Sequence, residues 1–334
     1  MTAPWEDQEN KKLSNLIKKA KRKTFIRNII ISLIVSVIVL FGGALLNIQL
    51  ISSSSSQETK DEYALKSISG PNQYISGLTG EDGFLSGKTE YNLYKVVEGV
   101  PIPWLTKKTV YNVFPFLPFA NIGGSANGLI ISLPDPDMIR EGYEYTRSYN
   151  GLNGQRLMEF YIPDVNYNGK VLNDLSILEQ MDQDKLVEMA ISFDKEYSLA
   201  EVRKMIPDKL TQVWYWVDTY DDKKYFEPYK DGNGNMSYAN PLNESWLFGF
   251  GIHLDGPQIN EKDFIASLEQ GLKGKYEYEF NRIYNYLRGD KAKPSESDIR
   301  ILGVVLTGNA KELQILKGQS YVRGAALGAV VDKY

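Results

Sequence analysis

The side chains most often used in catalysis and metal binding are scarce in this sequence. Its 334 residues contain no cysteine and a single histidine, His253. Without cysteine, disulfides, thiolate nucleophiles, iron–sulfur clusters and cysteine-based zinc sites are excluded. His253 ends an apolar run, where it could act as a general base or sense pH near neutrality. Because no Gly-x-Ser-x-Gly elbow or Ser-x-x-Lys pair supplies a nucleophile beside His253, a structural histidine is the simpler interpretation.

One acidic loop resembles the start of a calcium site. The segment Asp231-Gly-Asn-Gly-Asn235 begins like an EF-hand loop. Met236 and Leu242 stand where that loop requires glycine and glutamate, so a polar turn is the plainer interpretation.

Two further patterns also have ordinary explanations. Gly308-Asn309, between a predicted strand and helix, could offer free amides to an anion, but Asn309 and Glu312 already form a helix cap. The adjacent carboxylates Asp221 and Asp222 could serve a glycosidase, and they equally fit a solvated turn. We therefore expect no enzymatic activity, no cofactor and no metal.

The formal net charge of −4 hides a strong asymmetry. Residues 1–27 carry +5, which leaves −9 for the rest of the chain. The stretch Asn28–Gln57 has no charged residue, and within it Ile29–Leu46 is apolar except for Ser32 and Ser36. As a helix, this apolar run is ~27 Å long, which is enough to span a bilayer core with a short extension. A cleaved signal peptide is the alternative, but its apolar region has only ~7–15 residues.

The charges also predict an orientation. Because positive flanks stay in the cytoplasm, we expect the N-terminus inside and the body of the protein outside a cell membrane that it crosses once. The transmembrane helix and its basic flank contact lipid, whereas the acidic outer part disfavours binding to nucleic acid. Ser52–Ser56 predicts a flexible spacer.

The short cytoplasmic segment has helical periodicity. An apolar stripe recurs between Leu13 and Thr24, with lysines over the remaining surface. This helix either rests its cations on anionic lipid or docks a cytoplasmic partner. In the second case the partner-binding residues are Leu13, Leu16, Ile17, Lys18, Lys19, Lys21, Arg22 and Lys23.

The sequence predicts an α+β protein of five segments. These are a basic helix (1–27), a transmembrane helix (28–51), a serine-rich linker (52–62), a mostly β region (63–168) and a C-terminal α+β domain (169–334). In the β region, turn residues separate strands expected at Tyr63–Ser69, Tyr91–Glu98, Thr109–Phe116, Gly128–Leu133 and Gln155–Ile162.

The C-terminal domain should be a sandwich with helices packed on a mixed sheet. Strands are expected at Leu186–Phe193, Leu210–Tyr220, Trp246–Leu254, Ile301–Thr307 and Tyr321–Val331. Helices are expected at Leu172–Met181, after the Ser198–Glu201 capping box, from the Asn260 cap through to Gly289, and at Ala310–Leu316.

Several stretches resemble the sigma-factor-regulator family of Firmicutes, membrane-bound anti-sigma-factor proteins of the YhdL type. The resemblance runs in order along nearly the whole chain. It is carried by Leu16–Lys23, Arg27–Ser32, Ile68–Asn72, Tyr94–Pro101, Met189–Lys195, Val202–Pro207, Trp214–Tyr220, Ile301–Gly308 and Leu327–Tyr334.

The resemblance implies a regulator that holds an extracytoplasmic-function sigma factor at the membrane in response to envelope state, with or without a second membrane regulatory protein. The chain departs from anti-sigma factors that carry a larger cytoplasmic domain, often with a His-x-x-x-Cys-x-x-Cys zinc motif, because it has about 27 cytoplasmic residues and no cysteine. Two alternatives remain: an extracytoplasmic sensor or scaffold without direct sigma binding, and a membrane-tethered cell-wall hydrolase.

Overall fold

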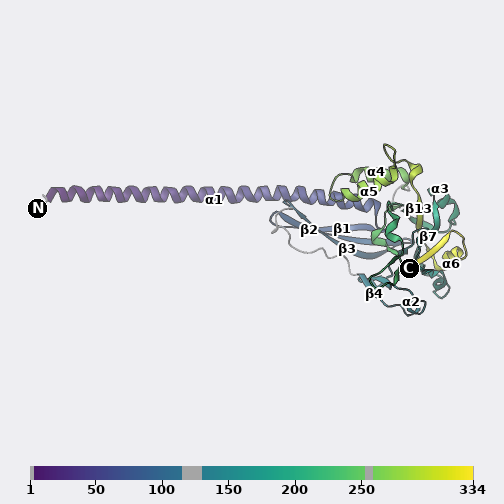
Figure 1. Cartoon of the computed structure of the whole chain (residues 1–334). Helices are drawn as coiled ribbons and strands as arrows, with labels where there is room; N and C mark the ends of the chain where they lie inside the picture. The colour runs from purple at the N-terminus through teal and green to yellow at the C-terminus, as the bar shows by residue number, and fades with distance from the viewer. Residues whose placement is uncertain (1–3, 115–129, 253–258, 334) are drawn as a thin grey trace.

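The protein consists of one very long helix with a compact body at its C-terminal end (Figure 1). The computed structural model describes residues 4–114, 130–252 and 259–333. Helix α1 (Pro4–Ile68) has 65 residues, a length of ~98 Å. It is the one helix among the described residues that is long and apolar enough to span a membrane, and the side chains of 29–46 are exposed along it. This fits a single-pass membrane protein.

Two predictions fail where α1 enters the body. The expected flexible spacer at 52–62 and the expected strand Tyr63–Ser69 are wrong, because the helix continues unbroken to Ile68. Serine is a weak helix former, but packing of one helix face against the body outweighs local propensity. Ile51, Glu58 and Glu62 are buried on that face.

The first sheet lies along α1. It is an antiparallel meander in the order β1-β2-β3. Its strands, which confirm the predicted β character of this region, are β1 (Tyr74–Asp82), β2 (Ser86–Val97) and β3 (Val100–Asn112). The strands run back beside the helix toward its N-terminus, so the sheet projects from the body (Figure 1).

The second sheet forms the centre of the body and has the order β12-β8-β13-β7-β14. Every pairing in it is antiparallel, so the predicted mixed sheet is wrong. The reason is that β13 returns between β7 and β8 after a long excursion and runs opposite to both. The strands are β7 (Leu186–Tyr197), β8 (Thr211–Val217), β12 (Gly249–Gly251), β13 (Ile301–Asn309) and β14 (Val322–Val331).

Both faces of this sheet are covered. On one side, Tyr215 and Val217 join a core with the helices, which confirms helices packed on a sheet. On the other side, Trp214 and Trp216 pack against loop segments around Phe160, with 5.4 Å between the ring centroids of Phe160 and Trp216. The helices are α3 (Leu199–Met205), α4 (Glu261–Gly271), α5 (Glu277–Arg288) and α6 (Ala310–Leu313). The capping box expected at Ser198 is present, and the caps expected at Asn260 and Asn309 are capping boxes as well.

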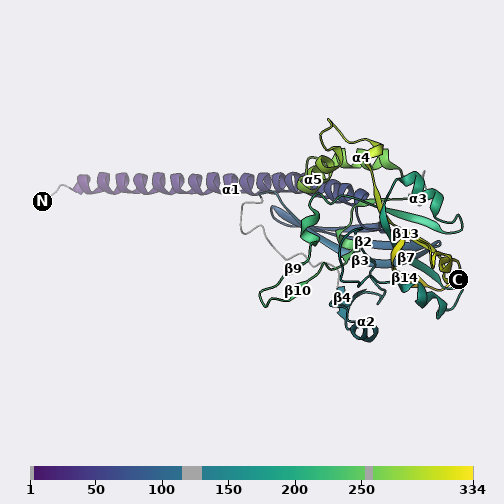
Figure 2. The ribbon, with the colours of Figure 1, turned by 45° about the vertical axis from the view of Figure 1, so that its right-hand side comes forward.

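The remaining elements are short and lie at the periphery, where Figure 2 shows the β9–β10 hairpin and α2 on the side away from α4. They are α2 (Pro136–Arg140), β4 (Ile130–Leu133), β5 (Arg147–Asn150), β6 (Glu159–Phe160), β9 (Tyr229–Lys230), β10 (Met236–Ser237) and β11 (Leu242–Asn243). The 3₁₀ helices are η2 (Asp174–Glu179), η3 (Lys223–Phe226), η4 (Glu244–Trp246), η5 (Glu296–Asp298) and η6 (Gln314–Leu316). The expected α-helix at Leu172–Met181 is thus the 3₁₀ helix η2.

The single helix expected from Asn260 to Gly289 is two helices. It breaks after Gly271, where α5 folds back so that Phe280 packs directly on that glycine. A Cβ atom at position 271 would stand 2.2 Å from the Phe280 ring.

Gly271→Ala is therefore expected to destabilise the protein by about 1–3 kcal/mol, because overpacking at Phe280 outweighs the better helix propensity of alanine. Thermal unfolding of the full-length protein in detergent measures the change. Gly232→Ala is the matched control, since a Cβ at Gly232 meets no described atom within 4 Å. A midpoint for Gly271→Ala at or above that of the control would contradict the packing described.

Candidate functional site

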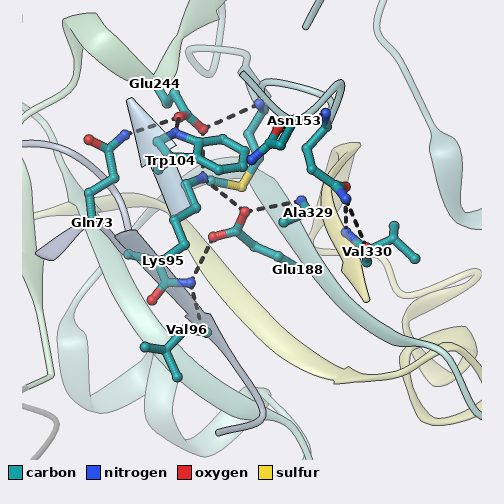
Figure 3. A network of polar contacts seen from close by, with 12 residues as sticks. Gln73, Lys95, Val96, Trp104, Asn153, Glu188, Glu244, Ala329 and Val330 are labelled. Atoms are coloured by element: carbon teal, nitrogen blue, oxygen red, sulfur yellow. Dashed lines mark hydrogen bonds and ion pairs between the residues drawn. The ribbon is translucent and has the colours of Figure 1, made fainter. Parts of the chain in front are cut away.

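A buried ion-pair cluster joins the two sheets. The Lys95 ammonium, on β2, lies 2.9 Å from the Glu188 carboxylate on β7 and 2.8 Å from the Glu244 carboxylate on η4 (Figure 3). All three side chains are 0% exposed. The same ammonium lies 4.1 Å from the centroid of the Trp104 ring, and the Trp104 indole donates a hydrogen bond of 2.7 Å to Glu244. Segments far apart in the chain thus share one buried cation.

Neutral donors complete the cluster. Asn72 donates to Glu188 at 2.8 Å and to the carbonyl of Val96 at 2.9 Å, which fixes the start of the first sheet. Gln73 donates to Glu244 at 3.0 Å, and the backbone amide of Ala329 on β14 donates to Glu188 at 3.2 Å (Figure 3). Buried charges are tolerated when they are paired and hydrogen-bonded in this way.

The titration of the cluster follows from its burial. Desolvation raises the pKa of the Glu188 carboxyl, and the nearby charge of Glu244 adds to this, while Lys95 opposes it. Desolvation alone would lower the pKa of Lys95, but the two carboxylates more than offset it and hold that pKa above its usual value. The ammonium is therefore charged at neutral pH and closed to solvent, which suits it to holding segments together.

A second polar contact attaches α1 to both parts of the body. Glu58 accepts hydrogen bonds from Tyr91, at 2.6 Å, and from Thr109. These two residues belong to the first sheet.

Glu62, one turn further along α1, reaches the C-terminal domain as well. Its carboxylate lies 2.6 Å from the Lys107 ammonium on β3 and 3.4 Å from that of Lys275 in the turn between α4 and α5. It also accepts a hydrogen bond from the Tyr276 hydroxyl. Two carboxylates on one helix face thus clamp α1 between the first sheet and the α4–α5 turn.

Two adjoining grooves open beside this clamp, with volumes of about 430 and 800 Å³. Both are lined by Lys66, and the larger one also by Tyr74, Tyr94 and Trp214. Desolvation lowers the pKa of Lys66 to about 7, against the opposing attraction of Glu244.

The patterns considered for catalysis are not assembled into a site. Asp221 pairs with Arg282 at 3.1 Å, while Asp222 caps η3 by accepting a hydrogen bond from the amide of Lys224. Asp231 accepts from the amides of its own turn, as expected of a polar loop. Among the described residues, no cluster of acidic residues and histidines could hold a metal ion. His253 lies outside the described residues.

The predicted partner-binding residues all lie on the free part of α1, far from the body (Figure 1). Each of them is exposed: Leu13, Leu16, Ile17, Lys18, Lys19, Lys21, Arg22 and Lys23.

The buried cluster was not foreseen from the sequence. The available signal was one charged residue within each of two apolar strand patterns, Lys95 in 91–97 and Glu188 in 186–193.

Comparison with known families finds two matched regions in the chain, and the Lys95 cluster joins residues of both. Residues 14–102 match the family described as Sigma factor regulator N-terminal, and residues 178–329 match the one described as Sigma factor regulator C-terminal. Lys95 lies in the first matched range, and Glu188 and Glu244 lie in the second. No curated protein and no solved structure matches the chain.

Lys95→Met is expected to cost about 3–5 kcal/mol of unfolding free energy at pH 8, because it leaves buried carboxylates without their cation. The pKa of Glu188 then rises further above its unfolded value. A carboxyl with a raised folded pKa loses stability as pH rises through that pKa, so the deficit should shrink between pH 8 and pH 5. Chemical denaturation of the full-length protein in detergent at both pH values measures this.

Lys88→Met provides the control, since Lys88 lies on the same strand and its partner Glu81 is exposed. It should change stability little and without this pH dependence. If Lys95→Met behaves like Lys88→Met, or if its deficit grows toward pH 5, the cluster does not hold the sheets together.

Proposed function

Because the chain belongs to the sigma factor regulator family, we propose that it is a membrane-anchored, anti-sigma-factor-like regulator of an extracytoplasmic-function sigma factor. The family is regulatory and implies a sigma factor as the partner in general. The observation that carries the finer proposal is that the N-terminal match begins at residue 14. The matched module therefore includes the lysine-rich part of the basic segment, the apolar span and strands β1 and β2.

The sigma-binding surface is the free N-terminal part of α1. Leu13, Leu16 and Ile17 share one face of the helix and are exposed, with Leu16 at 64%. An apolar stripe flanked by cations fits the groove of a partner protein, where a helix is recognised through residues spaced three and four apart. A single helix buries little area, which is why a second membrane regulatory protein would strengthen the hold.

The basic flank supports a cytoplasmic position for this surface and an outer position for the body, which would then meet the cell envelope. Helix α1 is continuous from the proposed sigma-binding surface to the Glu58 and Glu62 clamp. A change in the body that shifts or rotates the clamp would therefore move the far end of the same rod. Such coupling is the proposed route from envelope state to sigma factor.

The groove beside Lys66 favours a second candidate, an extracytoplasmic sensor or scaffold that acts without binding sigma directly. Its volume of about 800 Å³ and its aromatic lining suit a small envelope ligand. Deleting residues 8–24 separates the two: regulation that survives the deletion supports the sensor, and its loss supports sigma binding by α1.

Leu16→Asp in the full-length protein is expected to weaken capture of the partner sigma factor at least ~10-fold, about 1.4 kcal/mol, because it places a charge in the apolar stripe. Asn15→Asp is the matched control, since it adds the same charge on the opposite helix face. A two-hybrid assay or pull-down against the sigma factors of the cell measures both.

Wild-type protein that captures no sigma factor, with or without a second regulatory protein, would rule out direct sequestration. Equal loss in both variants would show that the stripe is not the binding face.

A further inference from the structure

The tip of the first sheet is fastened to the membrane-spanning helix. Between β1 and β2 the chain turns at Gly83 and Leu85, and both are bonded to Asn47 of α1. The Asn47 amide donates to the Gly83 carbonyl at 3.2 Å, and its oxygen accepts from the Leu85 backbone amide at 2.7 Å. Asn47 directly follows Leu46, the last residue of the apolar run. The hairpin therefore ends level with the end of the membrane span.

The hairpin is attached to α1 at a second point, nearer the body. Glu58 holds β2 and β3 through Tyr91 and Thr109, ~16 Å further along α1 than Asn47. Two points of attachment keep the hairpin parallel to α1, and Figures 1 and 2 both show it extending from the body toward the N-terminus of the helix.

The tip presents apolar side chains where a bilayer surface would lie. Phe84 is 73% exposed, and Phe114, which follows the residue bonded to Leu85, is exposed as well. The acidic groups near the tip are engaged, since Glu81 pairs with Lys88 at 2.9 Å and Asp82 accepts a hydrogen bond from Tyr111. If the tip did not contact a bilayer, Phe84 would remain in water and would not gain the free energy of burying its apolar surface.

The length of the apolar run sets the depth of the tip. Residues 29–46 span ~27 Å as a helix, close to the ~30 Å thickness of a hydrocarbon core. With Ile29 at one edge of the hydrocarbon core, Asn47 lies within about one helical turn of the other edge, and the hairpin turn bonded to it lies there too.

We propose that the β1–β2 tip, through Phe84 and Leu85, inserts into the interfacial region of the leaflet from which the body emerges. The occupant of this apolar tip is lipid, because the tip is continuous with the membrane span. Together with α1, the tip gives the body a second contact with the bilayer and fixes its orientation on the membrane. The inference depends on membrane anchoring and not on sigma binding.

The chain has no cysteine, so Phe84→Cys creates a single labelling site. The full-length variant, labelled with the fluorophore NBD, is reconstituted into vesicles of phosphatidylcholine and phosphatidylglycerol. Tyr278→Cys is the matched control: Tyr278 is 75% exposed, and its neighbour Tyr276 contacts Glu62, ~22 Å further along α1 than Asn47. Circular dichroism confirms that both variants are folded.

The expected result is blue-shifted emission at position 84, quenched by spin-labelled lipid and unchanged when the lipid-to-protein ratio is raised. Position 278 should show aqueous emission without quenching. Aqueous emission at position 84 would overturn the proposal. A blue shift at position 84 that disappears on dilution with lipid would also overturn it, because the tip would then contact a second copy of the chain.

Discussion

The burial of one ammonium group between two carboxylates holds this structure together. Lys95 comes from the N-terminal matched region, and Glu188 and Glu244 come from the C-terminal one. Separating the two regions would leave three charges either in water or buried without a partner. An unpaired buried charge costs far more free energy than a charge that stays in water. The two regions therefore behave as one body, although residues 103–177 separate the two matched ranges.

The rigidity of the body determines how firmly the long helix α1 is held. Because the body is one piece, Glu58 and Glu62 attach α1 to a single rigid support and not to two loosely joined domains. A serine-rich tether would let the body and the membrane segment move independently. A helix that continues through Ser52–Ser56 couples them, and this coupling is the physical basis for proposing that the body controls what binds the opposite end.

The sequence predicts the features that depend on local patterns. The apolar span, the helix caps and the strands of the central sheet follow from periodicity and from local hydrogen bonds, and all are present. The features it misses depend on distant partners. Lys95 is 93 residues from Glu188 and 149 from Glu244 in the chain, and no local pattern pairs them. Ser52–Ser56 is helical because of the sheet packed beside it, and the break at Gly271 depends on Phe280 folding back.

The central claim is that α1 is one rigid connection from the proposed sigma-binding surface to the body. Two spin labels at Ile26→Cys and Lys60→Cys, on exposed positions that bracket the membrane span and Ser52–Ser56, test it by pulsed electron paramagnetic resonance on full-length protein in bilayers. Continuous helix predicts one narrow distribution centred near ~51 Å between the labelled backbone positions. A broad distribution shifted to shorter distances would show a flexible tether and contradict the coupling.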